Sequence, residues 1–249
     1  MSLKEKLESG KEILGSWAIL PSPEAANVMI KAGLDFVLID MEHGPADYVT
    51  AQRMVMAAEA AGGCSVIRVG EHNEAAVLKA LDTGTGGVIV PHVSTPEDAR
   101  RAVSFMLYPP EGERGYSPYT KAGGYIHSAG YVQKANAAVL KGVIVEGKTG
   151  IDNLDAILAV KGLDLVYVGT YDISSTLGIA GQTSDPRVLK VLEESVAKIR
   201  KAGKSAGCLF KSEEELRYFR KLGIGFLTYK VDTWVLYEEF KKAADMVRK

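Results

Sequence analysis

The chain has 249 residues with a formal net charge of −1, 47% apolar residues and 24% charged residues, ordinary values for a globular protein. No basic stripe is interleaved with aromatic residues, which argues against nucleic acid as a partner. No apolar stretch reaches the ~18 residues that a membrane span needs. The charged, helix-prone start MSLKEKLESG does not resemble a secretory signal, so we expect a cytoplasmic protein with no membrane partner.

Strand-like and helix-like segments alternate along the whole chain. The predicted strands, short and rich in Val, Ile and Leu, are 13–20, 35–40, 64–69, 86–91, 142–146, 163–169, 204–210 and 224–231. The predicted helices are 22–33, 46–62, 73–84, 94–107, 126–140, 150–162, 185–203, 213–223 and the C-terminal segment 232–249. Continuous apolar strands are typical of parallel strands buried on both faces.

This alternation predicts an α/β fold, a (β/α)8 TIM barrel in which residues 1–249 form a single domain of the usual ~250-residue size. A doubly wound open sheet is the alternative, but no GxGxxG follows the first strand. The run 108–120 is rich in Pro and Gly and is expected to be a long loop.

The two cysteines lie far apart in the sequence, with no CxxC and no Cys/His cluster beside them. We expect Cys64 and Cys208 to be small buried thiols in a reducing cytoplasm, and we expect no zinc site built on them.

Two acidic residues mark the carboxyl ends of two predicted strands. Glu146 ends the strand 142–146, and Asp172 follows the strand 163–169. Desolvating a carboxylate costs several kcal/mol unless it is paired or binds a metal. Neighbouring parallel strands lie about 5 Å apart, so both carboxylates could hold one divalent cation. The alternative is ion pairing at the barrel rim.

The second and third strands end in further polar residues. The second ends in IDMEHGP, which places Asp40, Glu42 and His43 at the rim, and Arg68 lies near the end of the third. We expect Asp40 to orient His43 as a catalytic base, with a helix-capping pair as the alternative. Arg68 would hold a substrate carboxylate or an enolate oxygen, with a buried salt bridge as the alternative. Glu42 receives no role.

The remaining polar candidates have simpler interpretations. The histidines 72, 92 and 127 have no partner at metal-ligand spacing and are expected at the surface or behind the site. Asp82 and Arg114 are expected to form ordinary ion pairs. Lys230 is the only strand-end lysine that could form a Schiff base. The aromatic residues of the last helix are expected to pack, on this chain or on another subunit; they are Trp234, Tyr237 and Phe240.

A series of longer motifs runs through the chain in order. They are WAILPSPEAANVMIKAGLDFVLIDMEHGP, IRVG, LDTGTGGVIVPHVSTPEDAR, YPPEGERGY, VEGKTGIDNLDAI and VGTYDISSTLGIAGQ. Together they resemble the HpcH/HpaI family of class II, metal-dependent pyruvate aldolases, which includes 2-keto-3-deoxy sugar-acid aldolases and 2,4-dihydroxyhept-2-ene-1,7-dioate aldolase.

The resemblance implies roles for the strand-end residues. Glu146 and Asp172 correspond to the family's two metal-binding carboxylates. His43, paired with Asp40, matches the catalytic base, and Arg68 matches the arginine that contacts bound pyruvate. The implied cofactor is a divalent ion, Mg2+ or Mn2+, with Co2+ and Zn2+ as further options.

The resemblance also implies a substrate-binding segment and an assembly. The backbone of Gly169, Thr170 and Tyr171 up to the metal Asp resembles the segment that receives the pyruvate carboxylate. Asp82 resembles an acid that reaches a neighbouring subunit's site. Family members are commonly homo-oligomers, hexamers or trimers of dimers, that exchange the C-terminal helix.

The implied activity is that of an aldehyde-lyase (EC 4.1.2 type), which reversibly cleaves a 2-keto-4-hydroxy acid to pyruvate, or a close 2-oxo acid, and an aldehyde. Two positions depart from the family pattern: Ile144 stands where Gln is frequent, and Thr170–Tyr171 stand where Pro–Ala is common. These departures keep open a non-catalytic protein that binds metal and 2-oxo acid. A second alternative is a citrate-lyase-β-like enzyme acting on a CoA thioester, against which counts the lack of an obvious basic surface for the CoA phosphates.

Overall fold

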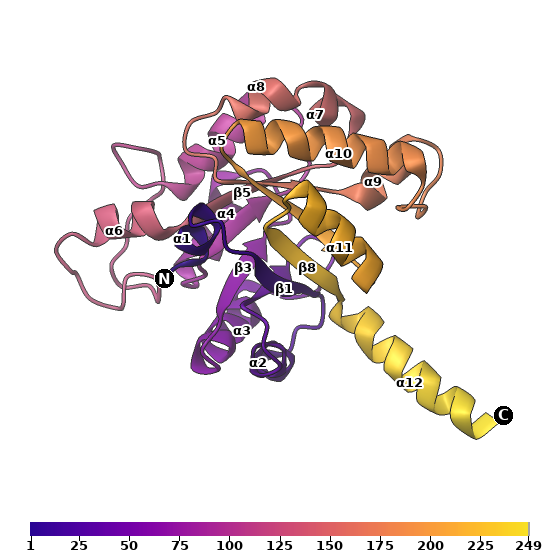
Figure 1. Ribbon diagram of the computed structural model, residues 1–249. Helices are drawn as coiled ribbons and strands as arrows, with labels where there is room; N and C mark the ends of the chain where they lie inside the picture. Colours follow the sequence, from indigo (N-terminus) through magenta and orange to yellow (C-terminus); the bar gives the residue numbers. More distant parts are fainter. Residues whose placement is uncertain (249) are drawn as a thin grey trace.

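Eight parallel strands close into a barrel in which each strand pairs with its neighbours in sequence and β8 pairs with β1 (Figure 1). The computed structural model describes residues 1–248. The strands are β1 Ile13–Ala18, β2 Phe36–Asp40, β3 Cys64–Arg68, β4 Gly87–Val90, β5 Leu140–Val145, β6 Leu165–Val168, β7 Ser205–Phe210 and β8 Phe226–Val231. This topology confirms the predicted (β/α)8 barrel.

Helices follow the strands and cover the outside of the barrel (Figure 1). They are α1 Leu3–Glu8, α2 Pro23–Lys31, α3 Tyr48–Ala60, α4 Glu74–Asp82, α5 Pro96–Met106, α6 Tyr131–Ala138, α7 Lys148–Asp152, α8 Leu154–Leu158, α9 Thr170–Thr176, α10 Pro186–Lys201, α11 Glu213–Leu222 and α12 Asp232–Arg248. Most of the long helices begin at a Ser, Thr, Asp or Asn cap, for example Asp47 at α3 and Asn73 at α4.

Two predicted elements differ from the structure. The helix predicted over 126–140 is shorter, because α6 ends at Ala138 and β5 already begins at Leu140. Leu140 pairs with Gly87 and packs inside the barrel, so burial outweighs the helical pattern that precedes it. The helix predicted over 150–162 is divided into α7 and α8 at Asn153, whose side-chain amide donates a hydrogen bond to the Ser94 carbonyl at 2.8 Å.

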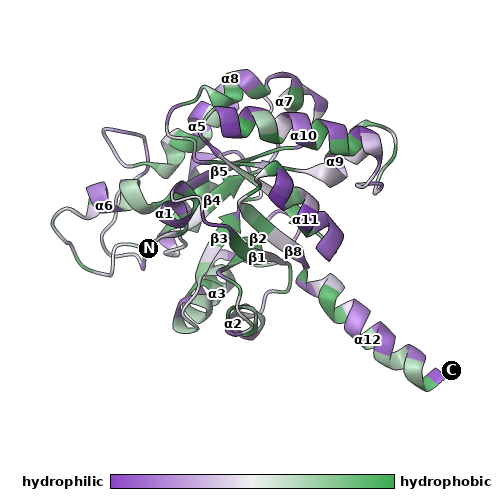
Figure 2. Ribbon diagram, viewed as in Figure 1, coloured by the Kyte–Doolittle hydropathy of each residue, from purple (hydrophilic) through white to green (hydrophobic). Residues whose placement is uncertain are grey.

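The barrel interior is packed and apolar, and α1 closes its amino-terminal end. Alternate strand residues point inward, including Phe36, Ile89 and Phe226, while Leu3 and Leu7 of α1 join the same cluster from below. A second cluster lies between the strands and the outer helices. Figure 2 shows the strands as the hydrophobic centre of the molecule, with hydrophilic residues facing outward on helices such as α10 and α11. The interior is therefore closed at one end and can be reached only from the carboxyl ends of the strands.

Both cysteines are free, as predicted. Cys208 is buried in the barrel wall, and burial raises the pKa of its thiol to about 12. Within residues 1–248, no helix is both long and apolar enough to cross a membrane.

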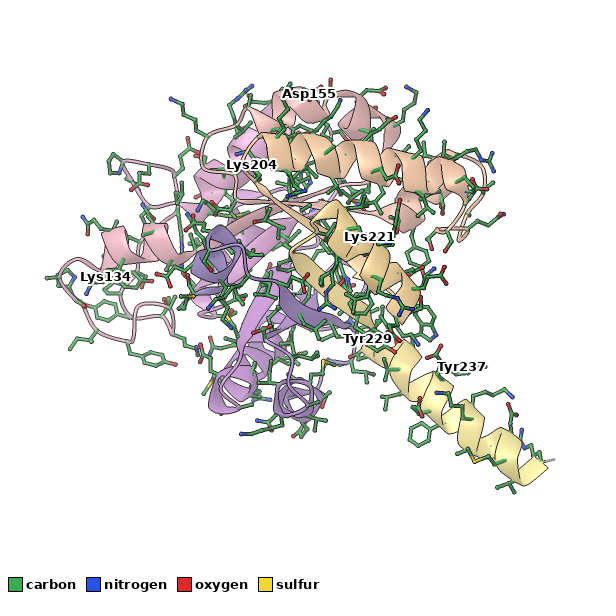
Figure 3. The ribbon with its side chains drawn as sticks, viewed as in Figure 1. Lys134, Asp155, Lys204, Lys221, Tyr229 and Tyr237 are labelled. Atoms are coloured by element: carbon green, nitrogen blue, oxygen red, sulfur yellow. The ribbon has the colours of Figure 1, made fainter. Side chains whose placement is uncertain are left out.

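The last helix leaves the barrel. α12 contacts β1 and β8 where it begins and then projects away from the other elements (Figure 1). Figure 3 shows Tyr237 on this projecting helix, where its side chain is 66% exposed, and Phe240 one turn later is 71% exposed. The structure therefore leaves an apolar face of α12 uncovered within one chain.

Candidate active site

A cavity of about 210 Å³ opens at the carboxyl ends of the strands. Every residue that the sequence analysis placed in the site lines this cavity: Asp40, His43, Arg68, Glu146, Gly169, Thr170, Tyr171 and Asp172. These residues come from the ends of β2, β3, β5 and β6 and the segments that follow. The fold thus brings together side chains from as far apart in the sequence as Asp40 and Asp172.

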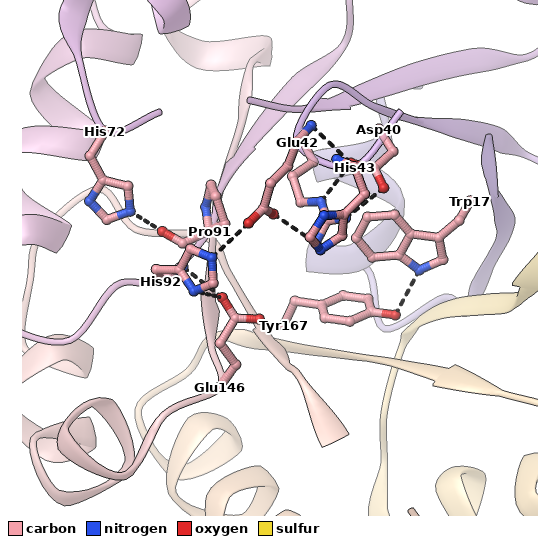
Figure 4. A network of polar contacts seen from close by, with 10 residues as sticks. Trp17, Asp40, Glu42, His43, His72, Pro91, His92, Glu146 and Tyr167 are labelled. Atoms are coloured by element: carbon pink, nitrogen blue, oxygen red, sulfur yellow. Dashed lines mark hydrogen bonds and ion pairs between the residues drawn. The ribbon is translucent and has the colours of Figure 1, made fainter. Parts of the chain in front are cut away.

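The floor of the cavity is a closed group of hydrogen bonds. The Trp17 indole N–H lies 3.1 Å from the Tyr167 hydroxyl and 3.2 Å from the Thr228 hydroxyl, and these two hydroxyls lie 2.6 Å apart. Burial raises the pKa of Tyr167 far above its usual value, so this phenol stays protonated. Figure 4 shows the hydrogen bond between the Trp17 indole and the Tyr167 hydroxyl. The polar atoms of the floor satisfy one another.

Arg68 is held by Asp40 and by the floor. Its Nε and Nη2 donate to the two Asp40 carboxylate oxygens at 2.9 and 2.6 Å, and its guanidinium stacks over the Trp17 ring at 4.4 Å. A forked pair of this kind fixes the plane of the guanidinium. The buried salt bridge considered as an alternative is therefore present, and Arg68 also lines the cavity.

The Asp40 carboxylate faces Arg68 in this structure. Its Oδ1 accepts the backbone N–H groups of Glu42 and His43 at 3.1 and 3.2 Å, and within residues 1–248 no hydrogen bond joins the carboxylate to the His43 imidazole. The Arg68 fork and these two backbone groups supply the donors to Asp40, and the predicted orientation of the His43 ring by Asp40 stays a prediction. His43 is exposed at the mouth, and its ring has no hydrogen-bond partner within residues 1–248.

Glu42 and His92, for which the sequence predicted no role, connect the two sides of the mouth. Glu42 Oε2 lies 2.9 Å from Arg68 Nη1 without hydrogen-bond geometry, and Glu42 Oε1 lies 2.6 Å from His92 Nε2. His92 Nδ1 lies 2.7 Å from Glu146 Oε1, and the backbone N–H of His92 donates to the same oxygen at 2.8 Å. Figure 4 shows this bridge. The position of His92, two residues after β4, is the signal that could have identified it.

Glu146 is the most constrained carboxylate of the site. It is buried, and a Cβ built on Gly169 would lie 2.6 Å from its Cβ and 3.0 Å from its Oε2, so only glycine fits beside it. Burial raises the pKa of Glu146, and the nearby charges of Asp172 and Glu42 raise it further, while the contacts with His92 oppose this rise. Without a bound cation, the site therefore disfavours the ionised form of Glu146 beside the carboxylate of Asp172.

A hard divalent cation fits these residues. Glu146 and Asp172 line one cavity, and Asp172 disfavours ionisation of Glu146, a repulsion that a bound cation would remove. Two carboxylates supply oxygen ligands of the kind that Mg2+ and Mn2+ prefer, and the cavity leaves room for further oxygens from substrate or water. Within residues 1–248 no cluster of three or more His, Cys, Asp or Glu side chains has metal-binding geometry.

The other candidates lie outside the cavity. Lys230 pairs with Glu238 of α12 and does not line the cavity, which removes the basis for a Schiff base there. Arg114 pairs with Asp82 at 2.9 Å, the ordinary ion pair that was expected.

Ile144 is buried and forms part of the cavity wall, so an apolar side chain occupies the position where the family often has an amide.

Comparison with known proteins agrees with this geometry. The sequence profile of the HpcH/HpaI aldolase/citrate lyase family matches residues 14–238. The chain belongs to the HpcH/HpaI aldolase/citrate lyase family. This family membership confirms the resemblance found in the sequence motifs, and it covers all of the strand ends described above.

Full-length relatives within the HpcH/HpaI family are named as aldolases. A 4-hydroxy-2-oxovalerate aldolase from Novosphingobium aromaticivorans is 35% identical, covering 100% of this chain and 94% of that protein. A 5-keto-4-deoxy-D-glucarate aldolase from Salmonella paratyphi C (strain RKS4594) is 32% identical, covering 99% and 96%. A crystal structure of an HpcH/HpaI aldolase/citrate lyase family protein from Burkholderia cenocepacia J2315 is 31% identical with a TM-score of 0.93, covering 99% of both chains. These matches support an aldehyde-lyase.

Proposed function

We propose that this HpcH/HpaI family member reversibly cleaves a 2-keto-4-hydroxy acid to a 2-oxo acid, pyruvate or a close relative, and an aldehyde. The observation that carries the proposal is the single cavity that places Glu146 and Asp172 beside Arg68 and His43. Its volume of about 210 Å³ suits a small acid.

Glu146 and Asp172 would hold the divalent cation, with Mg2+ or Mn2+ preferred over Co2+ or Zn2+ because both ligands are hard oxygens. The cation would act as a Lewis acid that stabilises negative charge on the keto oxygen, a contribution of several kcal/mol. Asp172 is exposed and Glu146 is buried, so one carboxylate remains open to solvent while the other is fixed.

Arg68 would bind the oxo acid and stabilise the enolate oxygen. Its fork on Asp40 and its stack on Trp17 hold the guanidinium in place before substrate arrives. The backbone from Gly169 to Tyr171 borders the same cavity and would receive the substrate carboxylate. Both groups therefore orient the substrate without having to move.

His43 would move the proton. In the cleavage direction its ring removes the proton of the substrate 4-hydroxyl, the C3–C4 bond breaks, and the electron pair of that bond passes to the enolate of the 2-oxo acid. The aldehyde leaves, and C3 of the enolate then takes up a proton. Because the His43 ring is exposed at the mouth and has no partner from Asp40, water in the mouth would restore its protonation state.

One observation favours a second candidate, a protein that binds metal and 2-oxo acid without cleaving it. Ile144 offers no hydrogen bond to a substrate or water in the cavity wall. By contrast, a CoA thioester lyase has less support, because a cavity of about 210 Å³ can hold only the acyl end of such a substrate.

We also propose that the protein is a homo-oligomer that exchanges α12 between subunits. The exposed apolar residues of α12, with Tyr237 and Phe240 among them, would be covered by a second copy. Light scattering coupled to gel filtration tests this proposal, with Phe240→Glu expected to lower the mass and a persistent monomer of the unaltered protein contradicting it.

The test of the reaction is release of 2-oxo acid from a small panel of 2-keto-4-hydroxy acids. EDTA should stop the release, and added Mn2+ or Mg2+ should restore it. A folded protein that binds Mn2+ and oxalate but releases nothing from any substrate would favour the binding role instead. Release that EDTA does not affect would contradict the metal-dependent mechanism.

A further inference from the structure

Among residues 1–248, the His92 side chain is the one that contacts both Glu42 and Glu146. Its ring places Nδ1 2.7 Å from Glu146 Oε1 and Nε2 2.6 Å from Glu42 Oε1 (Figure 4). The cavity itself is not lined by this ring. His92 therefore has no direct part in the reaction proposed above, and its contacts require another explanation.

The bridge continues from Glu42 to the substrate-binding side of the site. Glu42 Oε2 lies 2.9 Å from Arg68 Nη1, and the other two nitrogens of Arg68 bond to Asp40. The His92 ring is thus the middle of a continuous path of polar contacts. This path begins at a carboxylate assigned to the cation and ends at the guanidinium assigned to the oxo acid.

Packing does not account for the position of His92. Its side chain is 60% exposed, so few neighbours hold the ring in place. Its backbone has φ of +52°, a left-handed conformation that is strained for a non-glycine residue. The His92 side chain is exposed and its backbone is strained, yet both ring nitrogens contact carboxylates. These two contacts therefore account for its position.

We propose that His92 is a positioning residue that fixes the Glu146 carboxylate for the cation and links it to Arg68 through Glu42. The inference rests on the proposed function, because that function assigns the cation to Glu146. Partners that orient a metal-binding carboxylate from behind typically change metal affinity about 10–100-fold when they are removed.

The experiment measures binding of Mn2+ alone to the full chain, by the electron paramagnetic resonance signal of free Mn2+. In the His92→Asn variant, affinity should fall about 10–100-fold. Asn adopts the left-handed backbone readily, so the turn is kept, and its short amide cannot reach both acids. His127→Asn is the matched control, because His127 is also exposed and contacts only the Tyr116 hydroxyl, at 3.2 Å. The control should bind Mn2+ as the unaltered protein does.

A second variant tests the link through Glu42 and does not depend on the folding of the first. Glu42→Gln removes the charge between His92 and Arg68 and should also weaken Mn2+ binding, by less than His92→Asn. The double variant should bind no more weakly than His92→Asn alone, because both changes break one path. Fully additive losses would overturn the link through Glu42.

The two proposals can fail separately. If the unaltered protein does not bind Mn2+, or if Glu146→Gln leaves binding unchanged, the proposed function fails and this inference fails with it. If Mn2+ binding depends on Glu146 but His92→Asn binds as tightly or more tightly, the ring is indifferent to the cation or competes with it. That result would overturn the positioning role and leave the proposed function intact.

Discussion

Buried charges lie at both ends of the barrel, and they differ in what surrounds them. At the amino-terminal end, Lys141 is buried against Asp164 at 2.7 Å, and Lys4 of α1 approaches the same carboxylate at 3.2 Å. At the carboxyl end, the path from Asp40 through Arg68 and Glu42 borders an open cavity. Both sets are ion pairs in a wall of apolar strands, so burial of charge alone does not identify a functional site.

The difference is whether charge is left over. Lys4 and Lys141 face Asp164, Lys4 also lies 3.9 Å from Glu8, and α1 covers the barrel at that end, so two lysines balance two carboxylates and the group is closed. At the mouth, Glu146 and Asp172 add negative charge, and a buried oxygen of Glu42 has no hydrogen bond. An uncompensated group beside a cavity indicates a ligand, whereas a compensated group under a helix indicates structure.

The largest expected effect comes from removing the buried carboxylate at the mouth. Glu146→Ala should lower metal-dependent turnover by about 10³-fold or more, because Lewis-acid stabilisation is worth several kcal/mol. The measurement is kcat/KM with saturating Mn2+. Asp155→Ala is the control, since Asp155 lies at the surface and pairs only with Lys198. Activity that survives Glu146→Ala would show that the mouth is not the metal site.

The next effect concerns Arg68, the positively charged side chain at the mouth. Arg68→Lys keeps the charge but loses the fork on Asp40 and the stack on Trp17. We expect kcat/KM to fall about 10²-fold, as when one preorganised donor to an oxyanion is lost. Steady-state kinetics with the best substrate of the panel measures this. If kcat/KM fell only a few-fold, the role of Arg68 would be structural, like that of Lys141.

At the other end of the barrel, the expected effect is on stability alone. Among residues 1–248, Lys141→Met leaves Lys4 as the remaining lysine within ion-pair distance of Asp164, so we expect a loss of roughly 2–4 kcal/mol in the free energy of unfolding. Activity of the folded variant should remain. Urea unfolding compares it with Lys198→Met, which breaks a surface pair and should have little effect. A large loss of kcat/KM would break the distinction between the two ends.

The smallest effect is a change in pH dependence. Without metal, burial raises the pKa of Glu146 above its ordinary value of 4.5. The folded state then holds this proton more tightly than the unfolded state, so the stability it contributes is lost as pH rises from 4.5 through the folded pKa. Glu146→Gln should therefore be slightly more stable than the unaltered protein at neutral pH in EDTA, and equal to it at acid pH. A gain that does not vary with pH would contradict this.

Much of the mouth could be predicted because the strands are continuous and apolar. Charged residues at or within a few residues of the carboxyl end of a strand lie at the rim, and this rule located Glu146, Asp172 and Arg68. The same continuous apolar strands also predict the eight-stranded wall of the barrel. By contrast, the start of β5 was placed two residues late, because the helical pattern of α6 runs directly into Leu140.

The contacts between these residues could not be predicted, because each depends on competition among neighbours. The sequence offers Asp40 both a nearby imidazole and a distant guanidinium, and only the closed barrel shows that Arg68 occupies it. The bridge made by His92 depends on a left-handed turn after β4 that no residue type requires. Spacing can place a residue at the rim, but it does not identify its partner.

The floor of the cavity has a consequence for the isotopic course of the reaction. The polar hydrogens of Trp17, Tyr167 and Thr228 are used in hydrogen bonds to one another and from Thr228 to the Cys208 carbonyl, and packed apolar side chains lie below them. Solvent hydrogen can therefore approach the nascent methyl carbon only from the open side. In heavy water, a stereochemically labelled substrate should acquire deuterium on one face, and the handedness of the resulting chiral methyl group would report which face of the enolate the floor shields.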